Sequence, residues 1–227
     1  MWRVFYFKKR EIMKKLSAIV LGATGATGHE LVKLLLKDSN FIKVKIFVRR
    51  NPSIQNVKLH THEIDFSRLN NYKKLIRGDV LFSALGTTLN QAGSKKEQYL
   101  VDYAYQYQFA KIASENKIPC YSLVSTVGAN KSSHFFYPRT KGELEEEIKK
   151  LGFKKIYIFQ PPFLIRQPNL IRPGEKKVLK ILKVLNKVGL LKSQKPLPVK
   201  LLAQKMINEI KSNKKAGLKV YKPKDIF

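Results

Sequence analysis

Strand-like segments alternate along the chain with helix-like segments, in which apolar residues recur at helical spacing. The strand-like segments cover residues 17–21, 44–48, 58–64, 79–84 and 119–125, and a sixth is expected to end near residue 164. Continuous apolar runs such as residues 79–84 are typical of strands buried on both faces, and parallel strands need helical crossover connections. The alternation therefore predicts an α/β fold with a doubly wound parallel sheet.

A glycine-rich turn follows the first predicted strand. Residues 22–28 place glycines three residues apart, in the order Gly22, Ala23, Thr24, Gly25, Ala26, Thr27 and Gly28. Gly22 can take a turn conformation closed to most residues, Gly25 removes a side chain that would block a phosphate, and Gly28 lets the next helix press against the strand. The N-terminal amides of that helix would point at a bound anion. The pattern predicts a dinucleotide-binding loop, and a plain turn is the alternative.

Other strand ends carry further candidates, because ligands of such sheets lie beyond the carboxyl ends of the strands. Arg49 and Arg50 follow the second predicted strand, where an enzyme that binds NAD usually has an acidic residue. Two guanidinium groups suit a 2′-phosphate and favour NADP, although paired basic residues in a loop are often only solvated. Gly86, after the fourth strand, either passes beneath the cofactor or lies in an ordinary turn.

Ser125, Tyr137 and Lys141 are the candidate catalytic residues. Ser125 ends the fifth predicted strand, and Tyr137 and Lys141 lie four residues apart at the start of a helix. This spacing places both side chains on one helix face, so the ammonium lies near the phenol. A free tyrosine has a pKa of about 10, and a nearby cation favours its phenolate. We therefore expect Tyr137 to act as acid and base, tuned by Lys141.

Charge and cysteine content limit the setting. The 227 residues carry a net charge of +29, but the lysines are dispersed through nearly every segment. Nucleic-acid readers usually gather arginine and aromatic side chains on one face, so the dispersed charge argues against nucleic acid and for solvated surfaces. Cys120 is the single cysteine, and no segment approaches the roughly 20 apolar residues of a membrane span. A cytoplasmic protein is expected.

Three other features bear on partners and ligands. Residues 175–188 predict a basic amphipathic helix, which suits a lid over the active-site crevice or, as the alternative, peripheral contact with an anionic membrane. His60 and His62 share one side of a strand but have no third ligand at a recognisable spacing, so no metal site is expected. Asp102 and its neighbouring tyrosines fall on a long helix expected over residues 95–116, where aromatic side chains usually form a core or a helix–helix interface.

Together, these motifs resemble those of atypical or extended short-chain dehydrogenases/reductases, and the chain is most similar to the Tat-interacting-protein-type oxidoreductases of that superfamily. The resemblance covers residues 15–227, and its most specific part is the run from Gly128 to Glu143. It implies a Rossmann fold, with residues 15–165 as the NAD(P)-binding domain. Residues 1–14 are then an N-terminal extension, and residues 166–227 supply a C-terminal lid and docking helices integrated with the same domain.

The resemblance also implies NADPH as the cofactor. Its phosphates would lie at the glycine motif and its 2′-phosphate at Arg49 and Arg50, while the rest of the cofactor site would comprise Leu85, Gly86, Tyr137, Lys141, Leu164 and Arg172. The chain departs from the family at Ala26, where an acidic residue can occur, and at Thr126, where a second serine is common. The second departure leaves open whether Ser125 or Thr126 polarises the substrate.

These placements predict hydride transfer from NADPH to a small-molecule carbonyl substrate. Ser125 would donate a hydrogen bond to the carbonyl oxygen and Tyr137 would supply the proton. The alternative is an NADP(H)-binding regulatory or scaffold protein with little catalytic activity. A pure sensor has no need of Tyr137 and Lys141, so the pair favours the enzyme.

Overall fold

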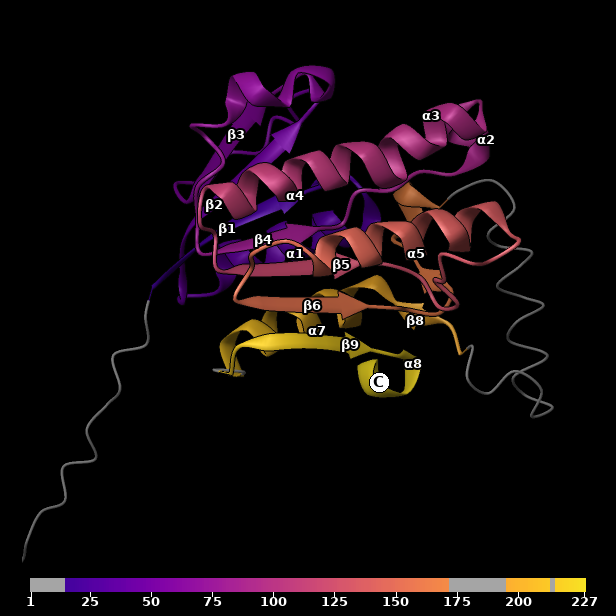
Figure 1. Ribbon diagram of the computed structural model, residues 1–227. Helices are drawn as coiled ribbons and strands as arrows, with labels where there is room; N and C mark the ends of the chain where they lie inside the picture. The colour runs from indigo at the N-terminus through magenta and orange to yellow at the C-terminus, as the bar shows by residue number, and fades with distance from the viewer. Residues whose placement is uncertain (1–14, 172–194, 213–214) are drawn as a thin grey trace, which may run out of the picture.

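A computed structural model describes residues 15–171, 195–212 and 215–227. Its main sheet has seven strands in the order β3-β2-β1-β4-β5-β6-β9, and every pairing between neighbours is parallel. Helices cover both faces, with α4 and α5 in front and α1 and α7 behind in Figure 1. The predicted doubly wound α/β fold is confirmed.

Five of the strands follow the predicted segments closely. The main sheet consists of β1 (Leu16–Leu21), β2 (Phe41–Val48), β3 (Leu59–Glu63), β4 (Val80–Ser83), β5 (Cys120–Val124), β6 (Lys155–Phe159) and β9 (Gly217–Tyr221). A second, two-stranded sheet pairs β7 (Leu164–Ile165) with β8 (Leu197–Pro198). The sequence did not predict β9, because its edge position leaves Gly217, Leu218 and Lys219 exposed and breaks the apolar run.

The helices differ from the predictions mainly near residue 100. The α-helices are α1 (Ala26–Lys37), α2 (Leu89–Ala92), α3 (Lys95–Tyr99), α4 (Tyr105–Glu115), α5 (Phe136–Lys149), α7 (Val199–Ser212) and α8 (Pro223–Ile226), and η1 (Phe66–Tyr72) and η3 (Pro168–Leu170) are 3₁₀ helices. The long helix expected over residues 95–116 is interrupted by a π-helical turn, η2 (Leu100–Ala104).

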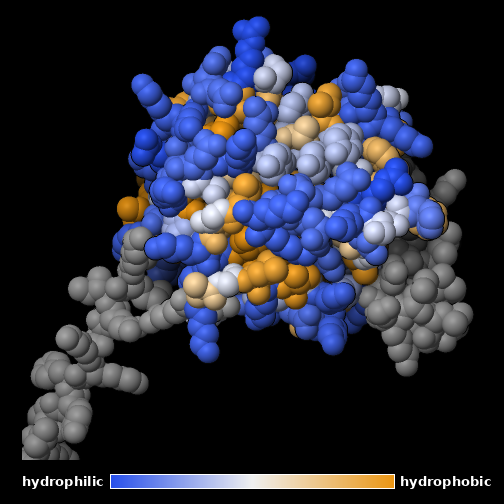
Figure 2. All heavy atoms as spheres, viewed as in Figure 1, coloured by the Kyte–Doolittle hydropathy of each residue, from blue (hydrophilic) through white to orange (hydrophobic). Residues whose placement is uncertain are grey.

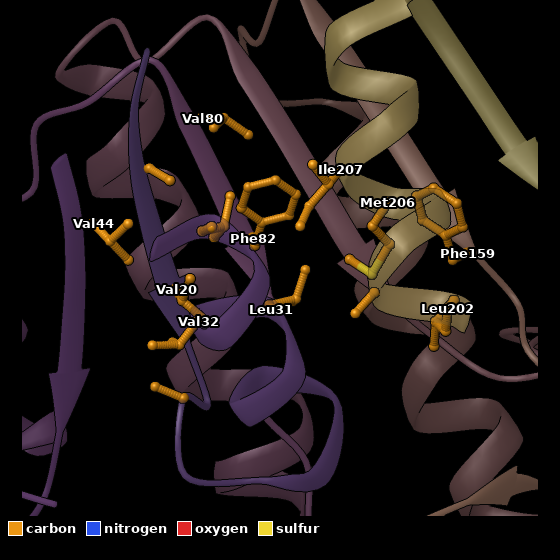
Figure 3. Close-up of a cluster of buried hydrophobic side chains, with 14 of the residues drawn as sticks. Val20, Leu31, Val32, Val44, Val80, Phe82, Phe159, Leu202, Met206 and Ile207 are labelled. Carbon is orange, nitrogen blue, oxygen red and sulfur yellow. The ribbon is translucent and has the colours of Figure 1, made fainter. Parts of the chain in front are cut away.

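An apolar cluster holds α1 and α7 against the back of the sheet. Behind the sheet, Phe82 of β4 belongs to one cluster with Leu31 of α1 and with Leu202, Met206 and Ile207 of α7, all fully or nearly fully buried. Figure 3 shows these side chains gathered between the sheet and the two helices. Burial of each such side chain stabilises the fold by about 1.5–3 kcal/mol, so α7 fixes the C-terminal segment to the back of the sheet.

The visible surface of the molecule is mainly hydrophilic. Hydrophilic side chains cover most of the face seen in Figure 2, and an apolar area lies low on it. Leu218 of β9, the strand at the edge of the sheet, is half-exposed. Among the described residues, no helix combines the length and apolar character that crossing a bilayer requires. The extension over residues 1–14 and the helix over residues 175–188 lie outside the described residues, so the domain division and the membrane contact stay predictions.

Candidate active site

The glycine turn lies where the strand order reverses, since β1 pairs with β2 on one side and β4 on the other. Gly22 has a φ of +81°, and a Cβ there would lie 2.6 Å from the backbone of Ala84 and Leu85. A Cβ on Gly28 would lie 2.0 Å from the Gly22 carbonyl oxygen. Both positions therefore require glycine, and the loop presses bare backbone against the end of β4.

The N-terminus of α1 opens into a cavity of about 550 Å³. Gly25 is the N-cap, has no side chain that could cap the helix amides, and is followed by a first turn without acidic residues. Free amides and the positive end of the helix dipole are a ready site for an anion. The candidates that line this cavity are Gly22, Thr24, Gly25, Ala26, Arg49, Leu85 and Gly86, whereas Thr27 and Gly28 are buried within α1. The geometry fits the pyrophosphate of a dinucleotide.

Arg49 and Arg50 extend the site beyond β2. Both are exposed, and together with Thr24 and Val48 they line a second cavity of about 480 Å³. Arg49 and Thr24 line both cavities, so the two spaces adjoin. A ligand whose phosphates lie at the glycine loop could therefore extend its ribose toward two guanidinium groups.

Arg166 also lines the main cavity, and the sequence did not point to it. The next residue, Gln167, donates from Nε2 to the Ala26 carbonyl oxygen at 3.0 Å and to Glu30 Oε1 at 2.8 Å. These bonds tie the segment after β7 to the first turns of α1, and Gln167 lies 141 residues after Ala26 in the sequence. No local pattern could reveal that contact.

The two candidates for the nicotinamide end are placed differently. Leu164 belongs to β7 and packs, half-buried, against the apolar cluster behind the sheet. Arg172 lies outside the described residues.

Tyr137 and Lys141 meet on α5, as their spacing indicated. The Lys141 ammonium lies 5.9 Å from the centroid of the Tyr137 ring. Tyr137 is 37% exposed near the start of the helix, whereas Lys141 is only 2% exposed. A Cβ added to Gly86 would lie 3.9 Å from Lys141 Nζ, so the ammonium stands directly behind the cavity wall.

Asp102 was expected only to lie on a long helix whose aromatic side chains form a core or a helix–helix interface, but the structure brings it next to Lys141. Its side chain is fully buried, and Oδ1 lies 3.2 Å from Lys141 Nζ. The same oxygen accepts a hydrogen bond from the Thr87 amide at 3.1 Å. Its position among tyrosines in a regular helical pattern gave no signal, because the π turn that turns it inward depends on tertiary contacts.

The Ser125 hydroxyl is engaged elsewhere. Ser125 is 4% exposed and donates to Oε1 of Glu145 on α5, and Gln160 Nε2 donates to both carboxylate oxygens at 3.0 Å. Burial raises the pKa of the Glu145 carboxyl, and the hydrogen bonds from Ser125 and Gln160 oppose that shift. Thr126, the other candidate, is only half-buried.

His60 and His62 both lie on β3, where the His62 ring stacks on Phe47 with centroids 4.9 Å apart. Burial is the largest cause that lowers the pKa of His62. In the part of the chain that the structure describes, no three histidine, cysteine, aspartate or glutamate side chains gather as metal ligands.

Known sequences agree with this geometry. A family model described as NAD(P)H-binding matches residues 22–158. FMP52-1 of Scheffersomyces stipitis, named as mitochondrial, is 35% identical over 182 residues, which cover 78% of this chain and 76% of that protein. HTATIP2 of Rattus norvegicus is 34% identical over 168 residues, which cover 72% of this chain and 69% of that protein.

Solved structures share the fold. The Bordetella bronchiseptica enzyme WbmH in complex with NAD+ superposes with a TM-score of 0.68 at 14% identity, covering 91% of this chain and 75% of that one. The ADP-L-glycero-D-manno-heptose-6-epimerase of Helicobacter pylori gives a TM-score of 0.69 at 13% identity, covering 94% and 81%. At such low identity the likeness concerns the architecture alone.

The relatives correct one expectation and establish the family. The FMP52 proteins of three fungi are named as mitochondrial, so the expected cytoplasmic location is wrong. Few cysteines indicate at most a reducing compartment, which does not distinguish the cytoplasm from other reducing compartments. Together with the glycine loop and the sheet order, the matches show that the chain belongs to the NAD(P)H-binding family of Rossmann-fold proteins, alongside FMP52 and HTATIP2.

Proposed function

We propose that this protein is an NADPH-dependent reductase that acts on a small carbonyl substrate. One observation carries the proposal: buried Lys141 lies between the Tyr137 ring and Gly86, which lines the cavity that begins at the glycine loop. A protein that only binds the dinucleotide has no need of a buried ammonium beside a phenol at this wall. An enzyme that protonates a substrate does.

NADPH is the proposed form of the cofactor. Its pyrophosphate would accept hydrogen bonds from the amides at the start of α1, and Arg166, which lines the same cavity, would add positive charge. Its 2′-phosphate would pair with Arg49 and Arg50, since guanidinium groups bind phosphate oxygens in a bidentate manner. When bound, the reduced nicotinamide supplies a hydride to the substrate carbonyl carbon.

Side chains of this protein would donate the proton and stabilise the group that loses it. The Tyr137 hydroxyl gives its proton to the carbonyl oxygen as the hydride arrives at carbon, and the product alcohol leaves a phenolate that solvent reprotonates. Lys141 stabilises that phenolate through its positive charge. Tyr137 is exposed enough to reach substrate, whereas the charge that supports it is shielded from water.

A hydroxyl group that polarises the carbonyl would complete the site. Ser125 and Thr126 both follow β5, but the Ser125 hydroxyl donates to Glu145 in a buried cluster. Thr126 is the more accessible of the two, and we assign it the hydrogen bond to the carbonyl oxygen.

The Ser125 contact also supports the second candidate function, an NADP(H)-binding regulatory protein. If Thr126 does not contribute, the site lacks a polarising hydroxyl and retains only cofactor binding. Substitution of Tyr137 distinguishes the two functions, because a regulatory protein has no proton to deliver.

The test is NADPH oxidation measured with a panel of aldehydes, ketones and quinones, for the wild type and Tyr137→Phe. General acid catalysis contributes about 10²–10⁴-fold, so Tyr137→Phe should lower kcat within that range on the best substrate. Its dissociation constant for NADPH should change less than threefold, roughly, because the phosphate contacts remain. Equal turnover by both proteins would refute the acid role of Tyr137, and NADPH binding without turnover of any substrate would favour the regulatory protein.

A further inference from the structure

The buried ion pair between Asp102 and Lys141 is not explained by cofactor binding. The two side chains are 0% and 2% exposed, and their charged atoms lie 3.2 Å apart. Removing such charges from water costs several kcal/mol, and apolar side chains of similar size often stabilise a fold at least as well. Stability alone therefore gives little reason for a buried carboxylate at this position.

The local backbone is built around Asp102. The π turn of η2 connects the Tyr105 amide to the Leu100 carbonyl and interrupts the regular hydrogen bonding of the helix. The Asp102 carbonyl oxygen accepts from Gln106 Nε2 at 2.9 Å and from Lys141 Nζ at 3.5 Å. Single π turns inside α-helices occur frequently at functional sites. Both the main-chain carbonyl and the side-chain carboxylate of Asp102 thus contact the Lys141 ammonium.

The carboxylate also joins the ammonium to the cofactor wall. Asp102 Oδ1 accepts from the Thr87 amide at 3.1 Å, and Thr87 lines the main cavity next to Gly86. The second carboxylate oxygen, Oδ2, has no hydrogen-bond partner among the described residues and is fully buried. One oxygen atom therefore fixes both the loop after β4 and Lys141.

Two other ionisable groups lie near Lys141 on its own helix. On α5, Tyr137 and Glu145 lie one turn before and one turn after Lys141, and Glu145 accepts hydrogen bonds from Ser125 and Gln160. The loop after β4 contributes uncharged Gly86 and Thr87.

Charged groups farther along the two helices also have partners. Lys95 of α3 lies 5.9 Å from the centroid of the Phe136 ring, and Arg139 lies 4.0 Å from Glu143. Tyr99 and Tyr103 of the α3–η2 segment lie beside Glu143 and Glu147, whose charges contribute to raised pKa values of the two phenols after the larger effect of burial. Asp102 supplies the negative charge in contact with the Lys141 ammonium.

We propose that Asp102 is a positioning residue for the proposed reductase, which holds Lys141 against the cofactor wall and partly cancels its charge at Tyr137. This inference rests on the proposed function for its meaning, but its physical content does not require turnover. An unpaired lysine would favour the phenolate more strongly than a paired one. Asp102 therefore keeps Tyr137 protonated, and able to donate, over a wider range of pH.

Charge-neutral variants at Asp102 provide the test. Asp102→Asn keeps the side-chain size, and Asp102→Ser removes the charge without placing an amide donor against the Thr87 N–H. Each should move the ionisation of the Tyr137 phenol to lower pH by about one unit, because the Lys141 charge near the ring is then no longer partly cancelled, and an opposite charge at such a distance lowers the pKa of an acid by about one to three units. The pH above which carbonyl reduction declines should move down by the same amount.

The measurement is an ultraviolet difference titration of phenolate, in which each protein is compared with the same protein carrying Tyr137→Phe. Asp79→Asn is the matched control, since Asp79 accepts hydrogen bonds from the Ser17 amide and hydroxyl at the far end of β1. Thermal unfolding establishes that every variant is folded at the titration temperature. Asp102→Glu retains the charge and should restore the wild-type midpoint.

A lower midpoint in Asp102→Asn and Asp102→Ser, with Asp79→Asn unchanged, would establish the effect. An unchanged or higher midpoint in either folded variant would overturn it. The titration needs no substrate, so it decides the role of Asp102 even if Tyr137→Phe turns out to oxidise NADPH normally and the reductase proposal fails.

Discussion

The two walls of the main cavity are built on opposite principles. The glycine-loop wall presents backbone alone, and its glycines are packed so closely that a Cβ would lie 2.0–2.6 Å from neighbouring main-chain atoms. Behind the other wall, at Gly86 and Thr87, lie the buried charges of Lys141 and Asp102, and Glu145 is buried one turn further along α5, so that each of the three is less than 5% exposed. The first wall depends on the absence of side chains, the second on the pairing of charged ones. Added volume should therefore damage the first wall, and altered charge or hydrogen bonding the second.

The largest effect is expected at Gly28. In Gly28→Ala the new methyl group would meet the Gly22 carbonyl oxygen at 2.0 Å, so the loop and α1 must move apart. Overpacking of this kind costs about 3 kcal/mol, and NADPH binding should weaken at least about 100-fold as the amides leave their positions. Calorimetric melting and fluorescence titration with NADPH measure both effects.

Gly152→Ala is the matched control, because its Cβ would make only a 3.5 Å contact with Ser114 Oγ. Normal NADPH affinity in Gly28→Ala would contradict the assignment of the loop to the pyrophosphate.

The next largest effects are expected at the two hydroxyl groups that follow β5, where Thr126 and Ser125 should differ. Thr126→Ala should lower kcat about 100-fold, since it removes the proposed hydrogen bond to the carbonyl oxygen. Ser125→Ala should leave kcat within about threefold but lower the free energy of unfolding by about 1–2 kcal/mol, because buried Glu145 loses a donor. The reverse result, with kcat sensitive to Ser125 and not to Thr126, would exchange their roles. Steady-state kinetics and urea unfolding provide the comparison.

Within the cofactor site, two arginines should differ in which dinucleotide they affect. Arg49→Ala should weaken NADPH about 10-fold and NADH much less, since Arg49 lines the cavity assigned to the 2′-phosphate. Arg166→Ala should weaken both dinucleotides alike, because they share the pyrophosphate near which Arg166 lies. Isothermal titration of both dinucleotides into both variants measures this ratio. An unchanged NADPH-to-NADH ratio in Arg49→Ala would refute the phosphate assignment.

The smallest effect concerns Glu145 and depends on pH. Burial raises the pKa of its carboxyl in the folded state, so its contribution favours folding at low pH and is lost as the pH rises from the ordinary glutamate range through the folded pKa. Glu145→Gln removes this dependence. The melting temperature of the variant minus that of the wild type should therefore increase by about 2–4 °C between pH 4 and pH 8.

Glu146→Gln is the control with the opposite sign, because a hydrogen bond from Lys149 lowers the pKa of the Glu146 carboxyl. A melting-temperature difference for Glu145→Gln that stays constant with pH would contradict the account.

The same contrast explains what the sequence could predict. The first five strands, the glycine loop and the pairing of Tyr137 with Lys141 all follow from local spacing, because a strand, a tight turn and one helix face are each set by neighbouring residues. The edge strand β9 escaped notice because only part of it is buried.

The missed site residues depend on contacts between distant segments. Arg166 lies at the cavity because the neighbouring Gln167 is hydrogen-bonded to α1. Asp102 contacts Lys141 from a π turn, which the spacing of apolar residues does not predict. The engagement of Ser125 likewise follows from a glutamate on α5 and a glutamine after β6. The loop wall could be predicted because it is local, and the charged wall could not because segments that are distant in the sequence meet there.

The central claim is that this cavity joins a dinucleotide to a proton-donating tyrosine. Its most direct test is transfer of deuterium from NADPH labelled at C4 to the carbonyl carbon of the best substrate, followed by mass spectrometry of the product for the wild type and Tyr137→Phe. The account predicts one deuterium in each wild-type product molecule, when the transferred face carries the label, and a rate at least about 100-fold lower in Tyr137→Phe. Deuterium transfer at equal rates in the two proteins, or NADPH oxidation without deuterium in the product, would contradict it.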